Sequence, residues 1–332
     1  MRDAASTPDR SASPRIQRFA WAVLAYNILV ILWGAYVRAT GSGAGCGSHW
    51  PTCNGEIIPR QPSLETLVEF SHRITSGLAL LGVLGLLFLA YRRFPKGHRA
   101  RSAAVASTIL IFTEAGIGAG LVLFELVADN ESMARALFMG THLGNTFLLL
   151  AAITLTCHWF GGAPAFRWRG DPLAKWAGAA VGAIMLVGIS GAVAALGDTL
   201  YPAESLLHGL QQDLSPTSHV LIKLRVWHPV LAIVGGLVVL HLVAEIRRAK
   251  RPQPVRRWAT AVNLLVIVQL AAGALNMVLL VPVWMQLVHL ALADALWISL
   301  VLLLAWAMAI REAADDGDVT GAAALRASYD SA

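Results

Sequence analysis

Apolar residues occur in eight long runs that are separated by short polar stretches. Each run approaches or exceeds the roughly 20 residues that a helix needs to cross a bilayer. The pattern therefore predicts an all-α polytopic membrane protein, in which the transmembrane helices lie at about 19–38, 68–90, 104–126, 136–157, 175–195, 223–245, 258–280 and 286–309.

The composition agrees with this pattern. Of the 332 residues, 56% are hydrophobic and 14% are charged, against about 25% charged residues in soluble domains. The mean hydropathy is +0.61. These values exclude a soluble globular enzyme, a disordered tail protein and a disulfide-stapled secreted domain. The formal charge of +6 does not indicate nucleic-acid binding, because the basic residues lie in short loops between apolar runs.

The basic residues predict the orientation of the chain. Twenty of the 26 lysines and arginines lie before the first run, after the second, fourth and sixth runs, or in the C-terminal tail. The positive-inside rule therefore predicts that both termini are cytoplasmic. The first run lacks the layout of a cleavable signal and is expected to act as an uncleaved anchor. We divide the chain into a disordered N-terminus (1–15), an N-terminal four-helix half (16–160), a cytoplasmic linker (161–174), a C-terminal four-helix half (175–310) and a cytoplasmic tail (311–332).

The two halves repeat each other in sequence. Glycine, histidine and small-residue motifs recur at offsets of 155 to 157 positions, and the last histidine pair recurs at 147 because the loop before the eighth run is shorter. Each unit has four spans, so both units share one orientation, related by an axis along the membrane normal. The repeat predicts two pseudo-symmetric four-helix bundles side by side.

Four of the ten histidines lie near the outer starts of the even-numbered runs. Ionisable or ligating groups at such a depth are costly and usually functional. Imidazoles on two facing helices can ligate one planar macrocycle from both sides, and haem iron accepts such axial nitrogens. We therefore predict two haem sites, His72 with His142 and His228 with His289. The alternatives are histidines that bond to neighbouring carbonyls, and zinc, which needs four converging ligands.

The halves differ one helical turn before the first histidine of each pair. Glu69 precedes His72 by three residues and shares its helix face, whereas Arg225 occupies the matching position before His228. A carboxylate beside a haem edge can exchange protons or stabilise positive charge, whereas an arginine suits a haem propionate. The first half is thus the expected reaction site, and the second a holding or electron-transfer site. A solvated Glu69, favoured by the helix dipole, is the alternative.

Four further charged residues are candidates. Arg73 and Arg38 lie on the outer side, where each can meet a propionate or snorkel to lipid headgroups. Glu114 and Asp294 fall inside predicted spans, which suggests a proton path. Gln269 at the repeat position of Glu114 favours instead a hydrogen bond between packed helices.

Two of the three cysteines share the first outer loop. Because the outer compartment is oxidising, Cys46 and Cys53 can form a disulfide, whereas Cys157 at the other side of the membrane cannot reach them. The surrounding glycines and proline suit a structural clip over the first haem site. A redox-active pair that passes electrons by thiol exchange is the alternative.

Three segments of the sequence, which contain Arg38, the two cysteines and the Glu69–His72 pair, together resemble the haem A synthase family in its cysteine-containing bacterial type. They are residues 34–43 (GAYVRATGSG), 46–55 (CGSHWPTCNG) and 69–73 (EFSHR), and the resemblance extends over about 18–310. It implies that His72 and His142 flank the substrate haem O, that His228 and His289 ligate a haem b cofactor, and that Glu69 is catalytic. The implied reaction oxidises the porphyrin C8 methyl to a formyl group, giving haem A for cytochrome oxidase.

The resemblance also implies a bacterial plasma-membrane location. Expected partners are a haem O synthase, cytochrome oxidase assembly proteins, membrane lipid and an unidentified electron acceptor. One departure is that residues 196–222 contain no cysteine, where some members carry a second pair. Two other functions remain open: a di-haem b-type cytochrome that exchanges electrons with quinone, and a transporter, which would need broken helices near the midplane.

Overall fold

A computed structural model describes residues 11–165, 168, 170–248 and 253–329, the stretch 309–329 through its helical backbone alone. Eight segments are helical, long and apolar enough to cross a membrane, which confirms the predicted spans. Over the described residues the secondary structure is helical, apart from one isolated bridge between Cys53 and Glu56. The elements are α1 (Pro14–Ala39), a 3₁₀ turn η1 (Ser42–Ala44), α2 (Leu64–Arg93), α3 (Arg99–Leu123), α4 (Met133–Phe160), α5 (Ala174–Leu200), α6 (Leu206–Leu214), α7 (Val220–Arg225), α8 (Trp227–Arg248), α9 (Gln253–Val278) and α10 (Val283–Tyr329).

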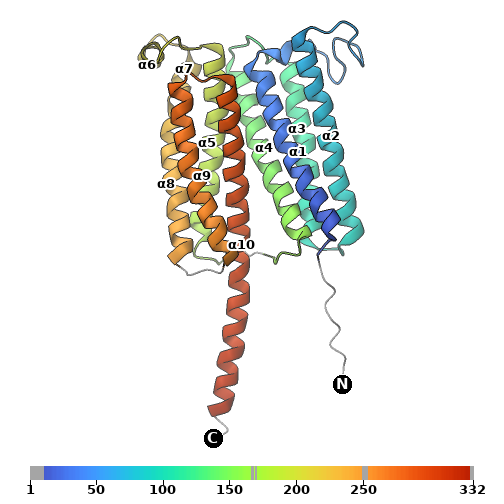
Figure 1. Ribbon diagram of the computed structural model, residues 1–332, viewed down its shortest axis with the longest axis vertical. Helices are drawn as coiled ribbons and strands as arrows, with labels where there is room; N and C mark the ends of the chain where they lie inside the picture. The colour runs from blue at the N-terminus through green and yellow to red at the C-terminus, as the bar shows by residue number, and fades with distance from the viewer. Residues whose placement is uncertain (1–10, 166–167, 169, 249–252, 330–332) are drawn as a thin grey trace.

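The spanning helices form two neighbouring groups, α1 to α4 in one and α5, α8, α9 and α10 in the other (Figure 1). The groups meet where α4 packs against α5 and α10, and where α1 packs against α10. In the most apolar windows of α4 and α10, 50% of positions are buried, against 17 to 33% in the other spans. These two helices therefore form the centre of the molecule. The exact symmetry between the groups stays a prediction.

Different segments of the chain lie at the two ends of the bundle (Figure 1). The start of α1 and the long extension of α10 lie at one end, whereas α6, α7 and the loop between α1 and α2 lie at the other. The basic residues predict that the first of these ends is cytoplasmic, and this orientation stays a prediction. Of the predicted disordered segment 1–15, residues 1–10 lie outside the described residues, while Pro14 already belongs to α1.

Several helices extend beyond the apolar runs. α2 and α4 start three to four residues before the predicted spans, after Ser63 and Ser132, whose hydroxyls accept backbone N–H groups of the first turn. α10 continues to Tyr329 instead of ending near residue 309. The continuation contains no proline that would end the helix and several alanines that favour it, although Gly317 and Gly321 lower its intrinsic helix propensity.

The sixth span is broken near its outer end. α7 ends at Arg225, a turn lies at Val226, and α8 starts at Trp227. Pro229 explains the break, because it has no N–H to donate to the carbonyl of Arg225 and its ring clashes with that carbonyl. The sequence alone predicted one continuous helix over 223–245, with the proline tolerated.

Two contacts, one buried and one partly buried, join the two groups of helices. Trp297 of α10 stacks on Phe147 of α4 with ring centroids 5.3 Å apart, and its indole N–H donates to the Phe147 carbonyl at 2.6 Å. Arg38 of α1 donates to the Ala195 carbonyl and the Thr199 hydroxyl of α5 at 2.8 and 2.7 Å, and to Gln286 of α10 at 2.6 Å. The first contact fixes the histidine-bearing helices α4 and α10 against each other, and the second fixes α1 against α5 and α10.

Candidate functional site

The second-half histidines face each other across the bundle. His228 of α8 and His289 of α10 have ring centroids 6.4 Å apart and ring planes at 87°. With metal–imidazole bonds of about 2.0 Å and each ring centre about 1.1 Å behind its nitrogen, two imidazoles on opposite sides of one iron have centres about 6 Å apart. The observed spacing therefore fits a shared axial metal, and both rings are half-buried.

The first-half histidines occupy corresponding places. His72 lies on α2 and His142 on α4, and both are half-buried. The Nδ1 atom of His72 is buried without a hydrogen-bond partner. Each half thus presents two imidazoles, from α2 and α4 in the first and from α8 and α10 in the second, and the binding of one haem by each pair stays a prediction.

Glycines on the preceding helices make room for the imidazoles. A Cβ atom added to Gly34 of α1 would lie 2.9 Å from Cε1 of His72, and one added to Gly191 of α5 would lie 3.0 Å from Cε1 of His228. The corresponding distance from Gly273 of α9 to His289 is 3.1 Å. Real Cβ atoms essentially never approach as closely as at Gly34, and the contacts at Gly191 and Gly273 would be tight enough that the imidazole must shift by a few tenths of an ångström.

The sequence alone used these glycines only as markers of the repeat. The fourth one, Gly118, would place a Cβ 3.9 Å from His142, which is ordinary contact. The repeat offset was the signal that could have assigned them a role, because a glycine that recurs at the same distance from a recurring histidine points to a shared contact.

Polar partners orient three of the four imidazoles. Ser190 Oγ lies 3.1 Å from His228 Nδ1. Glu114 Oε1 lies 3.3 Å from His142 Nδ1, and Gln269 Nε2 lies 3.4 Å from His289 Nε2. Such partners fix the orientation of histidines that bind metals. In the described part of the chain, no group of three or more His, Cys, Asp or Glu side chains converges in the way a zinc site requires.

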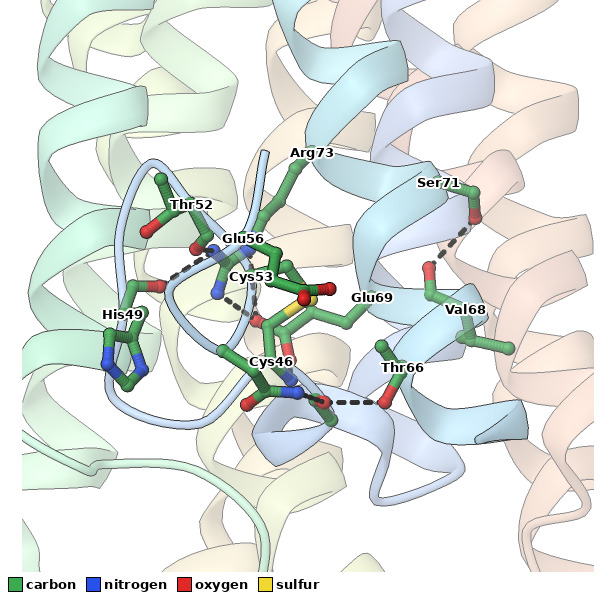
Figure 2. The surroundings of a disulfide bond; sticks show 12 residues. Cys46, His49, Thr52, Cys53, Glu56, Thr66, Val68, Glu69, Ser71 and Arg73 are labelled. Atoms are coloured by element: carbon green, nitrogen blue, oxygen red, sulfur yellow. Dashed lines mark hydrogen bonds and ion pairs between the residues drawn. A yellow bond between two sulfur atoms is a disulfide. The ribbon is translucent and has the colours of Figure 1, made fainter. Parts of the chain in front are cut away.

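Glu69 lies under the first outer loop (Figure 2). Its side chain is 4% exposed, its Oε2 accepts the Cys46 backbone N–H at 2.8 Å, and its Oε1 accepts two guanidinium N–H groups of Arg73 at 3.2 and 2.5 Å. The alternative of a solvated first-turn glutamate is therefore wrong for this structure. The carboxylate has a charged partner and a fixed orientation one turn from His72.

Arg73 connects this carboxylate to the loop. Its Nη1 donates to the carbonyls of His49 and Thr52 at 2.7 and 2.6 Å, as Figure 2 shows. Cys46 and Cys53 form a disulfide, as predicted, and both are fully buried. The disulfide loop, the arginine and the glutamate therefore form one hydrogen-bonded unit at the outer end of α2.

The other predicted arginine has protein partners as well. Arg225 is 9% exposed and contacts Asp213 at 2.7 Å and Asp198 at 3.2 Å. It also donates to Gln212 of α6 at 3.0 Å. Arg225 thereby holds the outer segment that contains α6 against α5, a role that its spacing from His228 did not indicate.

Asp294 is fully buried on α10, five residues after His289. Neither of its carboxyl oxygens has a hydrogen-bond partner.

Comparison with known proteins decides the family. The model of the COX15-CtaA family, described as cytochrome oxidase assembly protein, matches residues 17–301. The chain belongs to this family. The match includes all four histidines, Glu69 and the cysteine pair, and it confirms the resemblance on which the sequence-based expectations rested.

Individual relatives match this COX15-CtaA chain over a shorter range than the family model, or over only part of their own length. It is 50% identical over 268 residues, 79% of the chain, to a protoheme IX farnesyltransferase of Thermus thermophilus, and the match covers 43% of that relative. It is 39% and 36% identical over 128 residues to haem A synthases of Alkalihalophilus pseudofirmus and Halalkalibacterium halodurans, of which 40% is covered. The chain thus spans about two fifths of the length of the curated relatives it matches. Its eight apolar helices and its bacterial relatives identify a multi-pass plasma-membrane protein.

Proposed function

We propose that this chain is a haem A synthase, an oxidoreductase that converts the C8 methyl group of haem O to a formyl group. The observation that carries the proposal is the pair of matching imidazole sites in a COX15-CtaA member, of which only one has a carboxylate a helical turn away. Both sites offer two histidines to an iron, but their neighbouring residues differ. This arrangement suits a substrate haem at one site and a resident haem cofactor at the other.

The substrate haem O is assigned to the first half. His72 and His142 would hold its iron, and Glu69 would stand beside the reacting edge. Arg73 and Arg38 would supply positive charge toward the propionates. In the structure both guanidinium groups bind protein oxygens, so they are already ordered before any substrate arrives.

A resident haem b is assigned to the second half. His228 and His289 would hold it, and the 6.4 Å between their rings and the glycines beside them fit that assignment. Haem b would supply one-electron transfer. Arg225 was expected to meet a propionate, but Asp198 and Asp213 offset its charge and its N–H groups are taken by protein oxygens, so we assign it the role of holding the outer segment that contains α6.

Glu69 would move the protons of the reaction. Conversion of a methyl to a formyl group is a four-electron oxidation. With water as the oxygen source it releases four protons and four electrons to a one-electron acceptor, and with dioxygen it yields water. The ionised Glu69, which accepts N–H groups from Cys46 and Arg73, can take a proton at Oε1 or Oε2 and return it toward the outer loop.

The relatives also suggest where the substrate comes from. One of them is named a protoheme IX farnesyltransferase, and attaching a farnesyl group to protohaem is the chemistry that forms haem O. We propose that an enzyme of that kind supplies the substrate, which would arrive laterally through the lipid, and that the product serves cytochrome oxidase assembly.

The test is a comparison of Glu69→Gln with Glu65→Gln, expressed together with a haem O synthase. Glu65 lies one turn earlier on α2 and is exposed, so it controls for the loss of a charge. We expect the wild type and Glu65→Gln to produce haem A or its hydroxylated precursor. Glu69→Gln should bind haem, with a normal Soret band, but accumulate unchanged haem O.

Chromatography of the extracted haems measures the outcome. Normal conversion by Glu69→Gln would remove the proposed catalytic role of this residue. If the wild type yields only haem b and unchanged haem O, the chain is not a haem A synthase, and the di-haem cytochrome becomes the better explanation. His72→Ala should abolish the product, while His228→Ala should remove the resident haem b.

A further inference from the structure

The two halves differ in the group that faces the last histidine of each pair. In the first half, Glu114 of α3 lies 3.3 Å from His142 Nδ1. In the second half, the repeat position holds Gln269 of α9, which lies 3.4 Å from Nε2 of His289, while the buried Nδ1 of His289 has no hydrogen-bond partner among the described residues. A carboxylate on one ligand thus corresponds to a neutral amide on the other.

The surroundings of Glu114 hold it as a hydrogen-bond acceptor. Asn145 Nδ2 donates to its Oε2 at 2.5 Å, and the Thr146 hydroxyl donates to its Oε1. The orientation of the Asn145 amide is itself fixed, because its Oδ1 accepts the Thr113 hydroxyl at 2.7 Å and its Nδ2 also donates to the Leu110 carbonyl. Glu114 is therefore surrounded by donors, which suits a carboxylate.

The Nδ1 side of His142 faces into the protein. Its Nδ1 atom is buried, so the carboxylate is the group within reach of a proton on that nitrogen. An Nδ1–H that faces a carboxylate leaves Nε2 as the ligating nitrogen and makes it more basic. A more basic axial ligand favours ferric over ferrous iron, which lowers the reduction potential.

The second half lacks this effect among its described residues. Gln269 and Ser190, the groups that approach His289 and His228, are both uncharged. Neither makes its imidazole strongly basic. The repeat therefore preserves the ligands and changes the charge behind one of them.

We propose that Glu114 is a positioning residue that gives haem iron at the first site a lower reduction potential than iron at the second. This inference rests on the proposed function, because it requires iron at His142. Between the two sites, one electron would then leave ferrous iron at the first site and reduce ferric iron at the second. That direction is the one in which electrons must leave a substrate that is being oxidised.

The experiment measures midpoint potentials of the full-length protein loaded with iron protoporphyrin IX, by spectroelectrochemical titration of the Soret band. The double variant His228→Ala/His289→Ala retains only the first site, and His72→Ala/His142→Ala retains only the second. In the first-site protein, Glu114→Gln should reduce the ferric preference about tenfold, which is an upward shift of ~59 mV for a one-electron couple. Glu114→Asp, which keeps the charge at a longer distance, should shift the potential less.

Two controls distinguish a specific effect of Glu114 on the first-site reduction potential from a general effect of removing a negative charge. Glu125→Gln removes an exposed carboxylate just after the same helix and should leave the potential unchanged. Glu114→Gln should also leave the potential of the second-site protein unchanged. An unchanged or lower first-site potential in Glu114→Gln, or an equal shift at both sites, would overturn the proposal.

The proposed function has a separate readout, namely haem A in the extract of the wild type. A shifted potential without haem A would leave the role of Glu114 intact and remove the enzyme. Haem A in the extract without a shift of the reduction potential would support the enzyme and remove the proposed role of Glu114. A first-site protein that binds no iron protoporphyrin IX would overturn the role of Glu114 together with the ligand assignment.

Discussion

Replacing Gly191 by alanine should weaken haem binding at the second site without harming the fold. Gly191 lies inside α5, where an added Cβ would meet Cε1 of His228 at 3.0 Å and Nδ1 at 3.4 Å. Carbon atoms in contact prefer separations of about 3.5 to 4.0 Å. The imidazole must therefore retreat by roughly 0.5 Å, which is about the positional tolerance of a functional constellation.

The two consequences of Gly191→Ala have opposite signs. Alanine is about 1 kcal/mol more favourable than glycine inside a helix, so the thermal stability of the haem-free protein should stay the same or rise. Misplacement of the groups that orient a metal ligand typically costs about 10- to 100-fold in affinity, which corresponds to roughly 1.4 to 2.7 kcal/mol of binding free energy. Loss of haem from a stable protein is therefore the expected signature.

The chain offers a matched control on the same helix. An added Cβ at Gly182 meets nothing within 4 Å, so Gly182→Ala carries the helix-propensity gain without the contact. Both variants are purified, and their haem b content per protein is measured by the pyridine haemochrome assay. Equal haem content in Gly191→Ala and Gly182→Ala would refute the idea that this glycine makes room for the ligand.

Two further predictions concern the contacts between the groups of helices. Trp297→Phe keeps a ring that can stack on Phe147 but removes the indole N–H bond and leaves a cavity at this buried site, which should lower the unfolding free energy by about 2 to 3 kcal/mol, read as a lower Tm in detergent. Arg38→Lys cannot bind α5 and α10 at once, and should lose about 1.5 to 3 kcal/mol in the same assay. Arg18→Lys, at an exposed site, is its control; equal Tm values for these two variants would contradict the role of Arg38.

The sequence predicted the spans well because their physical signal is local. Apolar runs of membrane length exist before any tertiary contact forms, and all eight became helices. The ends were harder to predict, since capping and propensity act outside the apolar window. α2 starts at a serine cap before its run, and α10 continues through an alanine-rich polar stretch that hydropathy excludes.

The site was predicted in part for the same reason. The histidines could be found from spacing and repeat, and the proximity of Glu69 to them followed from helix periodicity. The partners of Arg225 could not be found in this way, because Asp213 and Asp198 lie 12 and 27 positions away. The bond between Glu69 and the Cys46 backbone likewise depends on how the outer loop folds back over α2.

In each repeat, the residues that set the position of a histidine ligand differ from the residues that set the charge beside it. A glycine on the first helix of each half faces the histidine of the second, at 2.9 Å for Gly34 and 3.0 Å for Gly191, so the imidazole position depends on shape. Charge differs one turn away, where Glu69 in one half corresponds to Arg225 in the other. Shape and charge are set by different residues. One helical frame can therefore place two imidazole pairs alike and still assign oxidation to one pair and electron transfer to the other, as the proposed function requires.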